Sequence, residues 1–87
     1  MRCSVVILNW NGADMLRRYL PSVVEHTMGM SDVEVVVADN GSTDESLSLL
    51  AAEFPGVRTI ALDKNYGFAE GYNKAIALID SEYTVLL

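Results

Sequence analysis

Apolar residues follow two different spacings along this chain, and the change from one to the other predicts both strands and helices. Short apolar runs rich in β-branched residues, each bounded by turn-forming residues, are typical of strands buried on both faces. Such runs predict strands at residues 3–8, 33–38, 57–62 and 83–87. Between these runs, apolar positions recur at helical spacing and predict helices that begin near Asp14, just after Ser42, and at Phe68.

The expected helix boundaries depend on a few local residues. Asn11 or Asp14 can cap the first helix, and Pro21 predicts a break just before it, because proline cannot donate to the residue four positions back. Ser42 and Glu45 have the spacing of a capping box, so Ser42 is the expected cap of the second helix. We therefore expect a kinked first helix and a second helix that is capped from within its own loop.

The order of the elements predicts a parallel sheet. Strands that alternate with connections long enough for helices form right-handed crossovers almost without exception. The expected fold class is therefore α/β, with three layers around a doubly wound, Rossmann-like parallel sheet. Because residues 83–87 begin a fourth strand with no turn or helix after it, we expect residues 1–87 to be the N-terminal portion of a longer, truncated domain.

Composition and charge narrow the class of protein. Hydrophobic residues make up 51% of the 87 residues, which suits strands covered on both faces, and a net charge of −6 does not favour nucleic-acid binding. The single cysteine, Cys3, cannot form an internal disulfide and fits a reducing compartment. Without a signal peptide or an uncharged run of membrane-spanning length, the chain is expected to be soluble and cytoplasmic, with association of the full-length protein with the cytoplasmic face of a membrane left open.

Polar segments follow each of the first three predicted strands. In an open α/β sheet, ligands bind beyond the carboxyl ends of the strands, and these segments share that edge. Asp39 can accept hydrogen bonds from a base or a ribose hydroxyl, although an aspartate after a strand equally fits an Asx turn or a helix cap. Trp10 between Asn9 and Asn11 suits a flat heterocycle with polar edges, while Asn11 alone fits a helix cap equally well.

The third polar segment and the helix after it offer weaker signals. Gly67 allows a close backbone approach at a helix N-terminus, where N–H groups can receive phosphate oxygens. Asn73 lies within the predicted helix, where asparagine is a mediocre helix former, so we expect it to face the crevice. Lys64 could meet a diphosphate, but a single loop lysine is usually solvated.

Several motifs that define other nucleotide-binding classes are absent from the sequence. No G-x-G-x-x-G follows the first predicted strand, and no G-x-x-x-x-G-K-[ST] occurs, so the sequence fits neither a dinucleotide oxidoreductase nor a P-loop NTPase. Zinc-ligand spacing and a nucleophile elbow are also lacking.

Taken together, three segments resemble the family 2 glycosyltransferases, and in particular the rhamnosyltransferase-like branch. They are SVVILNWNGADMLRRYLPSV, VEVVVADNGSTDES, and DKNYGFAEGYNKAI followed by YTVLL. The resemblance implies a type A glycosyltransferase fold with strand order 3-2-1-4 that binds a UDP, dTDP or GDP sugar. By motif match it implies a nucleotide-binding set of Leu8, Asn9, Trp10, Asn11, Asp39, Asn65, Gly67 and Asn73.

The resemblance also implies parts that we do not expect within residues 1–87. The Asp-x-Asp motif for Mg²⁺ or Mn²⁺ would follow the strand that starts at Tyr83, and the acceptor-binding half with its general base would lie further on. We therefore predict a parent enzyme that transfers a sugar to a glycan or lipid-linked acceptor hydroxyl, and an inactive fragment without catalytic or metal-binding residues of its own.

Two alternatives remain open at this stage. One is a sugar-phosphate nucleotidyltransferase, which would place a Gly-rich basic loop where this chain has residues 9–12. The other is a nucleotide-binding or self-associating module without catalysis, which would form a homo-oligomer through an exposed edge strand or apolar surface.

Overall fold

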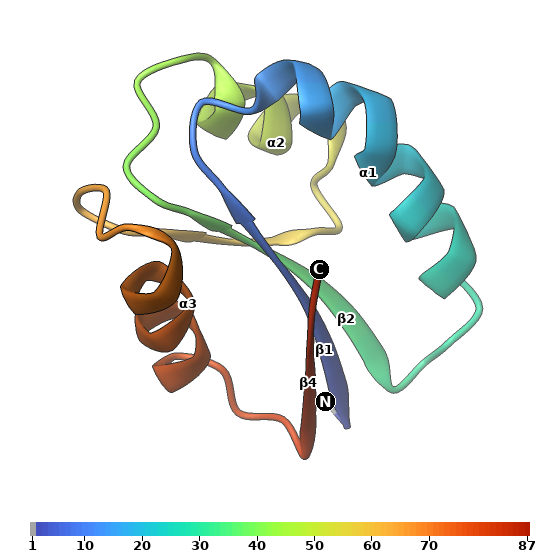
Figure 1. Cartoon of the computed structure of the whole chain (residues 1–87). Coiled ribbons are helices and arrows are strands. Elements are labelled where there is room, and N and C mark those ends of the chain that lie inside the picture. The colour runs from blue at the N-terminus through green and yellow to red at the C-terminus, as the bar shows by residue number, and fades with distance from the viewer. Residues whose placement is uncertain (1) are drawn as a thin grey trace.

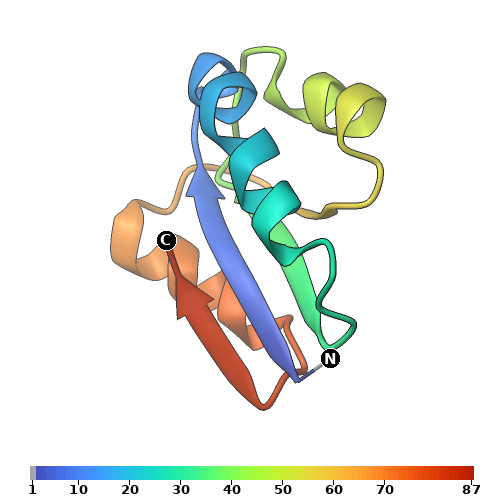
Figure 2. The same cartoon turned by 90° about the vertical axis from the view of Figure 1, so that its right-hand side faces the viewer.

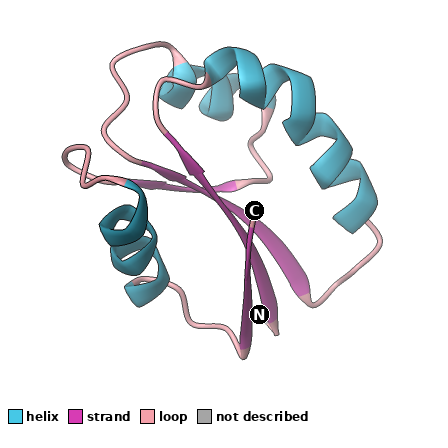
Figure 3. Ribbon diagram, viewed as in Figure 1, coloured by secondary structure: helices cyan, strands magenta, loops and turns pink. Residues whose placement is uncertain are grey.

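The computed structural model describes residues 2–87, which form a four-stranded parallel sheet flanked by helices (Figures 1 and 3). Each predicted strand and helix is present. The elements, in chain order, are β1 (Cys3–Asn9), α1 (Ala13–Thr27), β2 (Val33–Asp39), α2 (Ser46–Glu53), β3 (Arg58–Ala61), α3 (Phe68–Ala77) and β4 (Tyr83–Leu86).

The strands are arranged in the order β3-β2-β1-β4, which confirms the predicted order and the parallel sheet. Helices α1 and α2 cover one face of the sheet, and α3 covers the other, so the fold has three layers (Figures 1 and 2). Because all strands run in the same direction, the loops after β1, β2 and β3 lie at one edge of the sheet. That edge contains the three polar segments that follow β1, β2 and β3.

Strand β2 shows why the sheet is apolar throughout. Side chains of a strand alternate between faces, so Val35 and Val37 pack with Leu16 and Leu50 beneath α1 and α2. Val36 and Ala38 belong to the second core, which packs beneath α3. Burial of both faces explains the unbroken run of β-branched residues, which is typical of a parallel sheet.

Pro21 does not break α1, which runs without interruption from Ala13 to Thr27. The predicted break was wrong because proline destabilises the helix only locally. It removes one backbone donor, which leaves the carbonyl of Arg17 without its helical hydrogen bond. Pro21 and Arg17 both belong to the exposed side of the helix, where water can bond the free carbonyl. The buried side chains of Leu16 and Leu20 hold both halves of the helix on the sheet.

Within the described residues, strand β4 lies at an edge of the sheet and pairs with β1. Tyr83, Val85 and Leu86 are exposed there, as is Leu87 just beyond the strand. Among residues 2–87, no helix combines the length and the apolar character needed to cross a bilayer.

Candidate functional site

The loops after β1 and β2 are joined by backbone and side-chain hydrogen bonds. Asn9 and Asp39 are paired in the parallel register, and the N–H of Asn40 donates to the carbonyl of Asn9 at 2.7 Å. The N–H of Leu62, which follows β3, donates to the carbonyl of Asp39 at 2.8 Å. Three neighbouring strands therefore end at the same level, and their loops can share side-chain partners.

Asp39 is the centre of the first hydrogen-bond cluster. Its side chain is 1% exposed. Oδ1 accepts from Asn9 Nδ2 at 2.9 Å and from Ser42 Oγ at 2.7 Å, while Oδ2 accepts from the Ser42 N–H at 2.9 Å. Of the two roles left open by the sequence, the bond to the N–H of Ser42 shows the turn-stabilising one. The carboxylate organises the loop from inside the protein.

Asn11 connects the first loop to the second. Its backbone adopts a φ of +48°, a left-handed conformation that asparagine tolerates better than most residues. Its N–H donates to Ser42 Oγ at 2.8 Å, and its Oδ1 accepts from the N–H groups of Thr43 at 2.7 Å and Asp44 at 3.2 Å. Asn11 therefore does not cap α1 but fixes the conformation of the loop after β2.

Asp44 caps two helices at once. Oδ2 accepts from the N–H of Ala13, the first residue of α1, at 3.2 Å, and Oδ1 accepts from the N–H and Oγ of Ser46 at 2.9 and 2.5 Å, where α2 begins. These donors, the Ser46 hydroxyl above all, lower the pKa of Asp44 below its ordinary value. The predicted capping box was wrong, because Ser42 is bonded to Asp39 and α2 begins only at Ser46.

Asn40 joins the third loop to the other two. It is 3% exposed. Its Nδ2 donates to Asn65 Oδ1 at 3.1 Å and to the carbonyl of Gly67 at 3.0 Å, and its Oδ1 accepts from the N–H of Tyr66 at 3.0 Å. Asn40 is not among the residues that the sequence indicated, since nothing in its local pattern points to a partner 25 residues away.

Two glycines make this close approach possible. Gly41 has a φ of +76°, and a Cβ atom there would lie 2.5 Å from the carbonyl carbon of Lys64. Gly71 lies against Asn40, and a Cβ atom there would come within 2.9 Å of Asn40 Nδ2. The loop after β2 therefore fits between the loop after β3 and α3 without space for a side chain at either position.

An apolar groove lies beside the first loop. Its volume is about 330 Å³, and it runs between the end of β1 and α1. Trp10, which is 55% exposed, lines this groove together with Leu8, Met15 and Tyr19. The indole is thus available to a ligand, next to the buried amide of Asn9.

The comparisons with known proteins agree with this arrangement. Residues 4–87, nearly the whole chain, match the family described as Glycosyl transferase family 2. The chain belongs to glycosyltransferase family 2.

Curated relatives of this family 2 chain are glycosyltransferases. An uncharacterized glycosyltransferase from Nostoc is 33% identical over all of the chain, which spans 27% of that relative. The N-acetylglucosaminyl-diphospho-decaprenol L-rhamnosyltransferase of Mycobacterium tuberculosis is 33% identical over 84% of the chain and 23% of its own length. The family 2 chain thus spans about a quarter of these two relatives.

Solved structures share its fold. TarS of S. aureus in complex with UDP-GlcNAc matches the whole chain with a TM-score of 0.84 at 23% identity, and the matched part is 26% of that structure. The mannosyltransferase PcManGT from Pyrobaculum calidifontis, in complex with GDP-Man and Mn²⁺, matches 91% of the chain with a TM-score of 0.74 at 25% identity, over 24% of its length. The predicted type A fold is confirmed by these neighbours.

Not all of the predicted site residues enter the hydrogen-bond network of this family 2 chain. Asn9, Asn11, Asp39, Asn65 and Gly67 are brought together by the contacts above. Leu8 and Trp10 line the adjoining groove. Asn73 is exposed on α3, and its side chain makes no hydrogen bond to residues 2–87, so its expected place in the crevice stays a prediction.

The side chain of Tyr66, in the third loop, forms a charged cluster with Asp63 and two lysines. Its hydroxyl donates to Asp63 Oδ1, and this bond is the main reason why the pKa of Tyr66 is raised and that of Asp63 lowered from their ordinary values. The Lys74 Nζ lies 4.5 Å and the Lys64 Nζ 5.2 Å from the centre of the Tyr66 ring. Both ammonium groups are therefore within cation–π distance of one ring.

The described part of this family 2 chain does not bring together side chains that would fit a divalent metal ion. Within residues 2–87, no group of three or more His, Cys, Asp or Glu side chains converges on one point. The carboxylates at the strand ends are already used, Asp39 inside the protein and Asp44 at two helix N-termini.

Proposed function

We propose that this chain provides the nucleotide-binding edge of a glycosyltransferase, which transfers a sugar from a nucleoside diphosphate sugar to an acceptor hydroxyl in polysaccharide or cell-surface glycan synthesis. The observation that carries the proposal is the network that joins the loops after β1, β2 and β3 through Asp39, Asn40 and Ser42 in a family 2 chain. A ligand at this edge meets loops whose geometry is set before it binds, which lowers the entropic cost of binding.

The proposed roles follow the position of each residue. Leu8, Trp10 and the neighbouring amides receive the base and ribose, because an exposed indole beside an apolar groove offers a stacking surface. Asn65, Gly67 and Asn73 border the diphosphate and sugar. Asp39 is 1% exposed, so in the described conformation a base or ribose does not reach its carboxylate, and Asp39 acts through its hydrogen-bond partners Asn9 and Ser42.

The displacement itself requires groups that residues 2–87 do not bring together. In the reaction that we propose for the parent enzyme, the acceptor oxygen attacks the anomeric carbon, its proton passes to a general base, and the nucleoside diphosphate leaves. A bound Mg²⁺ or Mn²⁺ ion would supply charge neutralisation for that leaving group. The Mn²⁺ in PcManGT supports a divalent metal in the parent enzyme, and we assign no ligand of it to this chain.

The parent protein also needs an acceptor and a location. The rhamnosyltransferase relative, whose name specifies a lipid-linked diphospho-sugar acceptor, supports a glycan or lipid-linked acceptor for the parent protein. We propose that the parent enzyme works in the cytoplasm, at the cytoplasmic face of the membrane where such an acceptor would be reached.

Calorimetric titration with UDP, dTDP and GDP tests the nucleotide-binding role. Trp10 is the only tryptophan, so its fluorescence should also be quenched when a base stacks on it. Trp10→Leu should reduce the affinity for the nucleotide that binds best by about tenfold, because stacking contributes about 1–3 kcal/mol per base. Since Trp10 is 55% exposed, this variant should fold normally.

Tyr83→Leu is the matched control, because Tyr83 is also an exposed aromatic residue, at 60%, but lies at the start of β4. It should bind nucleotide as the wild type does. Absence of binding to all three nucleotides, or equal affinity of the Trp10→Leu variant and the wild type, would argue against the proposed role.

A self-associating module without catalysis is a second candidate, favoured by the exposed apolar edge of β4. Val85 and Leu86 are 45% and 49% exposed on a strand with one free edge, a feature that promotes pairing between chains. Light scattering across a range of concentrations tests it: a monomer at the highest concentration removes this candidate and also the expected homo-oligomer.

A further inference from the structure

The orientation of two side-chain amides at the site is fixed by groups whose hydrogen-bonding character is not ambiguous. Oxygen and nitrogen of an asparagine amide are otherwise hard to tell apart, and the partners decide between them. For Asn40, the N–H of Tyr66 can only donate and the carbonyl of Gly67 can only accept. Oδ1 of Asn40 must therefore face Tyr66, and its Nδ2 must face Gly67 and Asn65.

The same reasoning fixes Asn65. Its Oδ1 receives the N–H of Gly67 at 2.7 Å and Nδ2 of Asn40 at 3.1 Å, so two donors converge on one oxygen. The amide nitrogen of Asn65 is left at the other end of the group. It makes no hydrogen bond to any of residues 2–87, and Asn65 is exposed. The loop therefore presents a donor outwards at this point and holds the acceptor inside.

We propose that Asn65 Nδ2 donates a hydrogen bond to an oxygen atom of the nucleotide ligand, and that Asn40 is the positioning residue that holds the donor outwards. The inference rests on the proposed function, and it adds the direction of the hydrogen bond. Suitable acceptors are oxygen atoms of the diphosphate or of the nucleoside. A ligand group that can only donate would find no partner on Asn65.

Packing around Asn40 keeps this orientation from relaxing. Asn40 is 3% exposed, and Gly71 lies so close that an added Cβ atom would be 3.2 Å or less from its Nδ2, Cγ and Oδ1 atoms. Rotation of the amide would leave the N–H of Tyr66 facing an NH₂ group and the carbonyl of Gly67 facing an oxygen. Both the space and the hydrogen bonds therefore oppose an alternative orientation.

Asn65→Asp tests the direct contact. The new carboxylate can still accept from Gly67 and Asn40, so the loop should keep its conformation, but the outward donor becomes an acceptor. We expect the affinity for UDP or GDP, whichever the wild type binds, to fall at least about tenfold. The loss should persist at about 0.5 M NaCl, where screening acts within roughly 5 Å. The exchange rate of the Gly67 amide hydrogen should stay as in the wild type.

Titration with the matching nucleoside locates the acceptor. If Asn65→Asp weakens binding of the diphosphate but not of the nucleoside, the acceptor oxygen belongs to the diphosphate. If it weakens both, the oxygen belongs to the nucleoside. Ser31→Asp adds the same charge in an exposed turn at the opposite edge of the sheet and should change neither affinity.

Asn40→Asp tests the positioning role. An oxygen would then face Asn65 Oδ1 and the carbonyl of Gly67, and their repulsion should release the Asn65 side chain. We expect faster exchange of the Gly67 amide and about tenfold weaker nucleotide binding. When Asn65→Asp is added to the Asn40→Asp variant, the nucleotide affinity should fall by less than about a further twofold, because Asn40 acts through Asn65.

Gly71→Ala reaches the same group without a new charge, since its Cβ atom would press on the Asn40 amide while alanine favours the helix. It should also speed exchange at Gly67 and weaken binding, whereas Gly56→Ala, which meets nothing within 4 Å, should do neither. A wild type that binds no nucleotide contradicts the proposed function. Wild-type binding that neither Asn65→Asp nor Asn40→Asp weakens overturns this inference alone, as does full additivity of the two.

Discussion

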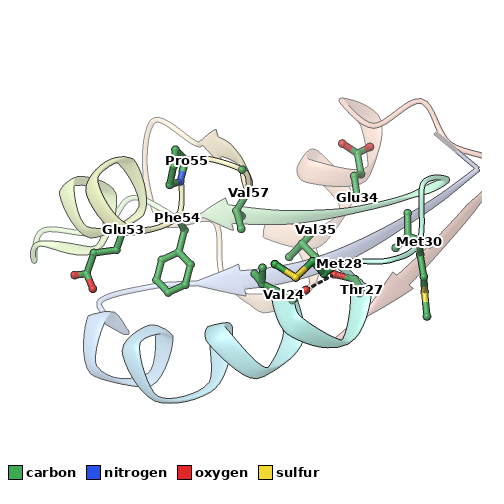
Figure 4. Close-up of a pocket in the computed structure, with 12 residues that line it drawn as sticks. Val24, Thr27, Met28, Met30, Glu34, Val35, Glu53, Phe54, Pro55 and Val57 are labelled. Atoms are coloured by element: carbon green, nitrogen blue, oxygen red, sulfur yellow. Dashed lines mark hydrogen bonds between the residues drawn. The ribbon is translucent and has the colours of Figure 1, made fainter.

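The two ends of the sheet differ in the polarity of the side chains that gather there. At the carboxyl end, buried polar side chains bond one another across three loops, with Asp39 and Asn40 almost completely enclosed. At the amino end, between the last turns of α1 and α2, a groove of about 380 Å³ is lined mainly by apolar side chains, among them Val24, Phe54 and Val57 (Figure 4). Both ends belong to one set of strands, so the difference comes from the residues and not from the topology.

The difference between the two ends shows which kind of contact fixes the conformation of a loop. Apolar side chains stabilise by the area that they bury, and they tolerate exchange for others of similar volume. A buried carboxylate or amide accepts only partners of the right kind in the right direction, and an unpaired group costs free energy. The carboxyl end should therefore respond sharply to single substitutions, and the groove in Figure 4 should respond weakly.

Asp39→Ala should have the largest effect. It removes the acceptor of the Ser42 N–H and hydroxyl and of Asn9 Nδ2 within a site that is 1% exposed. We expect the free energy of unfolding to fall by about 3 kcal/mol, measured by urea denaturation. Glu53→Ala, at the exposed rim of the groove, should change it by less than about 0.5 kcal/mol. Equal losses at both positions would remove the contrast between the two ends.

Gly41→Ala should come next. Alanine would have to adopt a φ of +76° and to place its Cβ atom 2.5 Å from the Lys64 carbonyl carbon. We expect a loss of at least about 2 kcal/mol in the free energy of unfolding, because the left-handed conformation alone costs about 1–2 kcal/mol. Gly29→Ala, where nothing lies within 4 Å, is the paired control and should be nearly neutral. A neutral Gly41→Ala would show that the two loops can separate freely.

Asp44→Asn should have a smaller, pH-dependent effect. Since the pKa of Asp44 is lowered in the folded chain, its contribution to stability is fully present above its unfolded pKa of about 3.9 and is lost as the pH falls through the folded value. The variant should melt at a lower temperature than the wild type at pH 6, and the gap should be narrower at pH 3, below the unfolded pKa. Circular dichroism melting curves at both pH values measure it. A gap that widens in acid would contradict the assignment.

Met28→Ala should have the smallest effect. The side chain lines the groove at the amino end but is 79% exposed, so its removal uncovers little new surface. We expect a change below about 0.5 kcal/mol in the free energy of unfolding and an unchanged nucleotide affinity. A loss of unfolding free energy comparable to that of Gly41→Ala would mean that the groove is as sensitive to substitution as the loop network.

The sheet could be predicted from the sequence because its signal is local. Apolar runs such as Val33 to Ala38 indicate by their composition that they are buried. The connections between the runs are long enough for helices, and such connections are almost always right-handed crossovers, which leaves few possible topologies. The caps could not be predicted, because they depend on distant partners. The pattern of Ser42 and Glu45 is present in the sequence, but Asp39 and Asn11 bind Ser42 first, and Asp44 reaches the N-terminus of α1 from across the loop.

The sequence predicted where the site residues lie better than it predicted what each of them does. Strand ends located Asn9, Asp39 and Asn65 at one edge, as they lie in the structure. Asn40 was missed because nothing in the sequence around it distinguishes it from an ordinary loop asparagine. Its function is visible only in the structure, where the third loop contacts its side chain. The burial of Asp39 was equally hidden, since a carboxylate after a strand can face either way.

Unequal helix cover has a consequence for motion. Helices α1 and α2 share one face of the sheet, whereas α3 lies alone on the other, with Phe68 at its start 76% exposed (Figure 2). Within residues 2–87, α3 packs on the sheet through Tyr72 and against the loop after β2 through Gly71, so any detachment of α3 in thermal fluctuations would also release the contact between Gly71 and Asn40. Phe68 would move with α3, as would the adjoining Gly67, whose carbonyl accepts a hydrogen bond from Asn40.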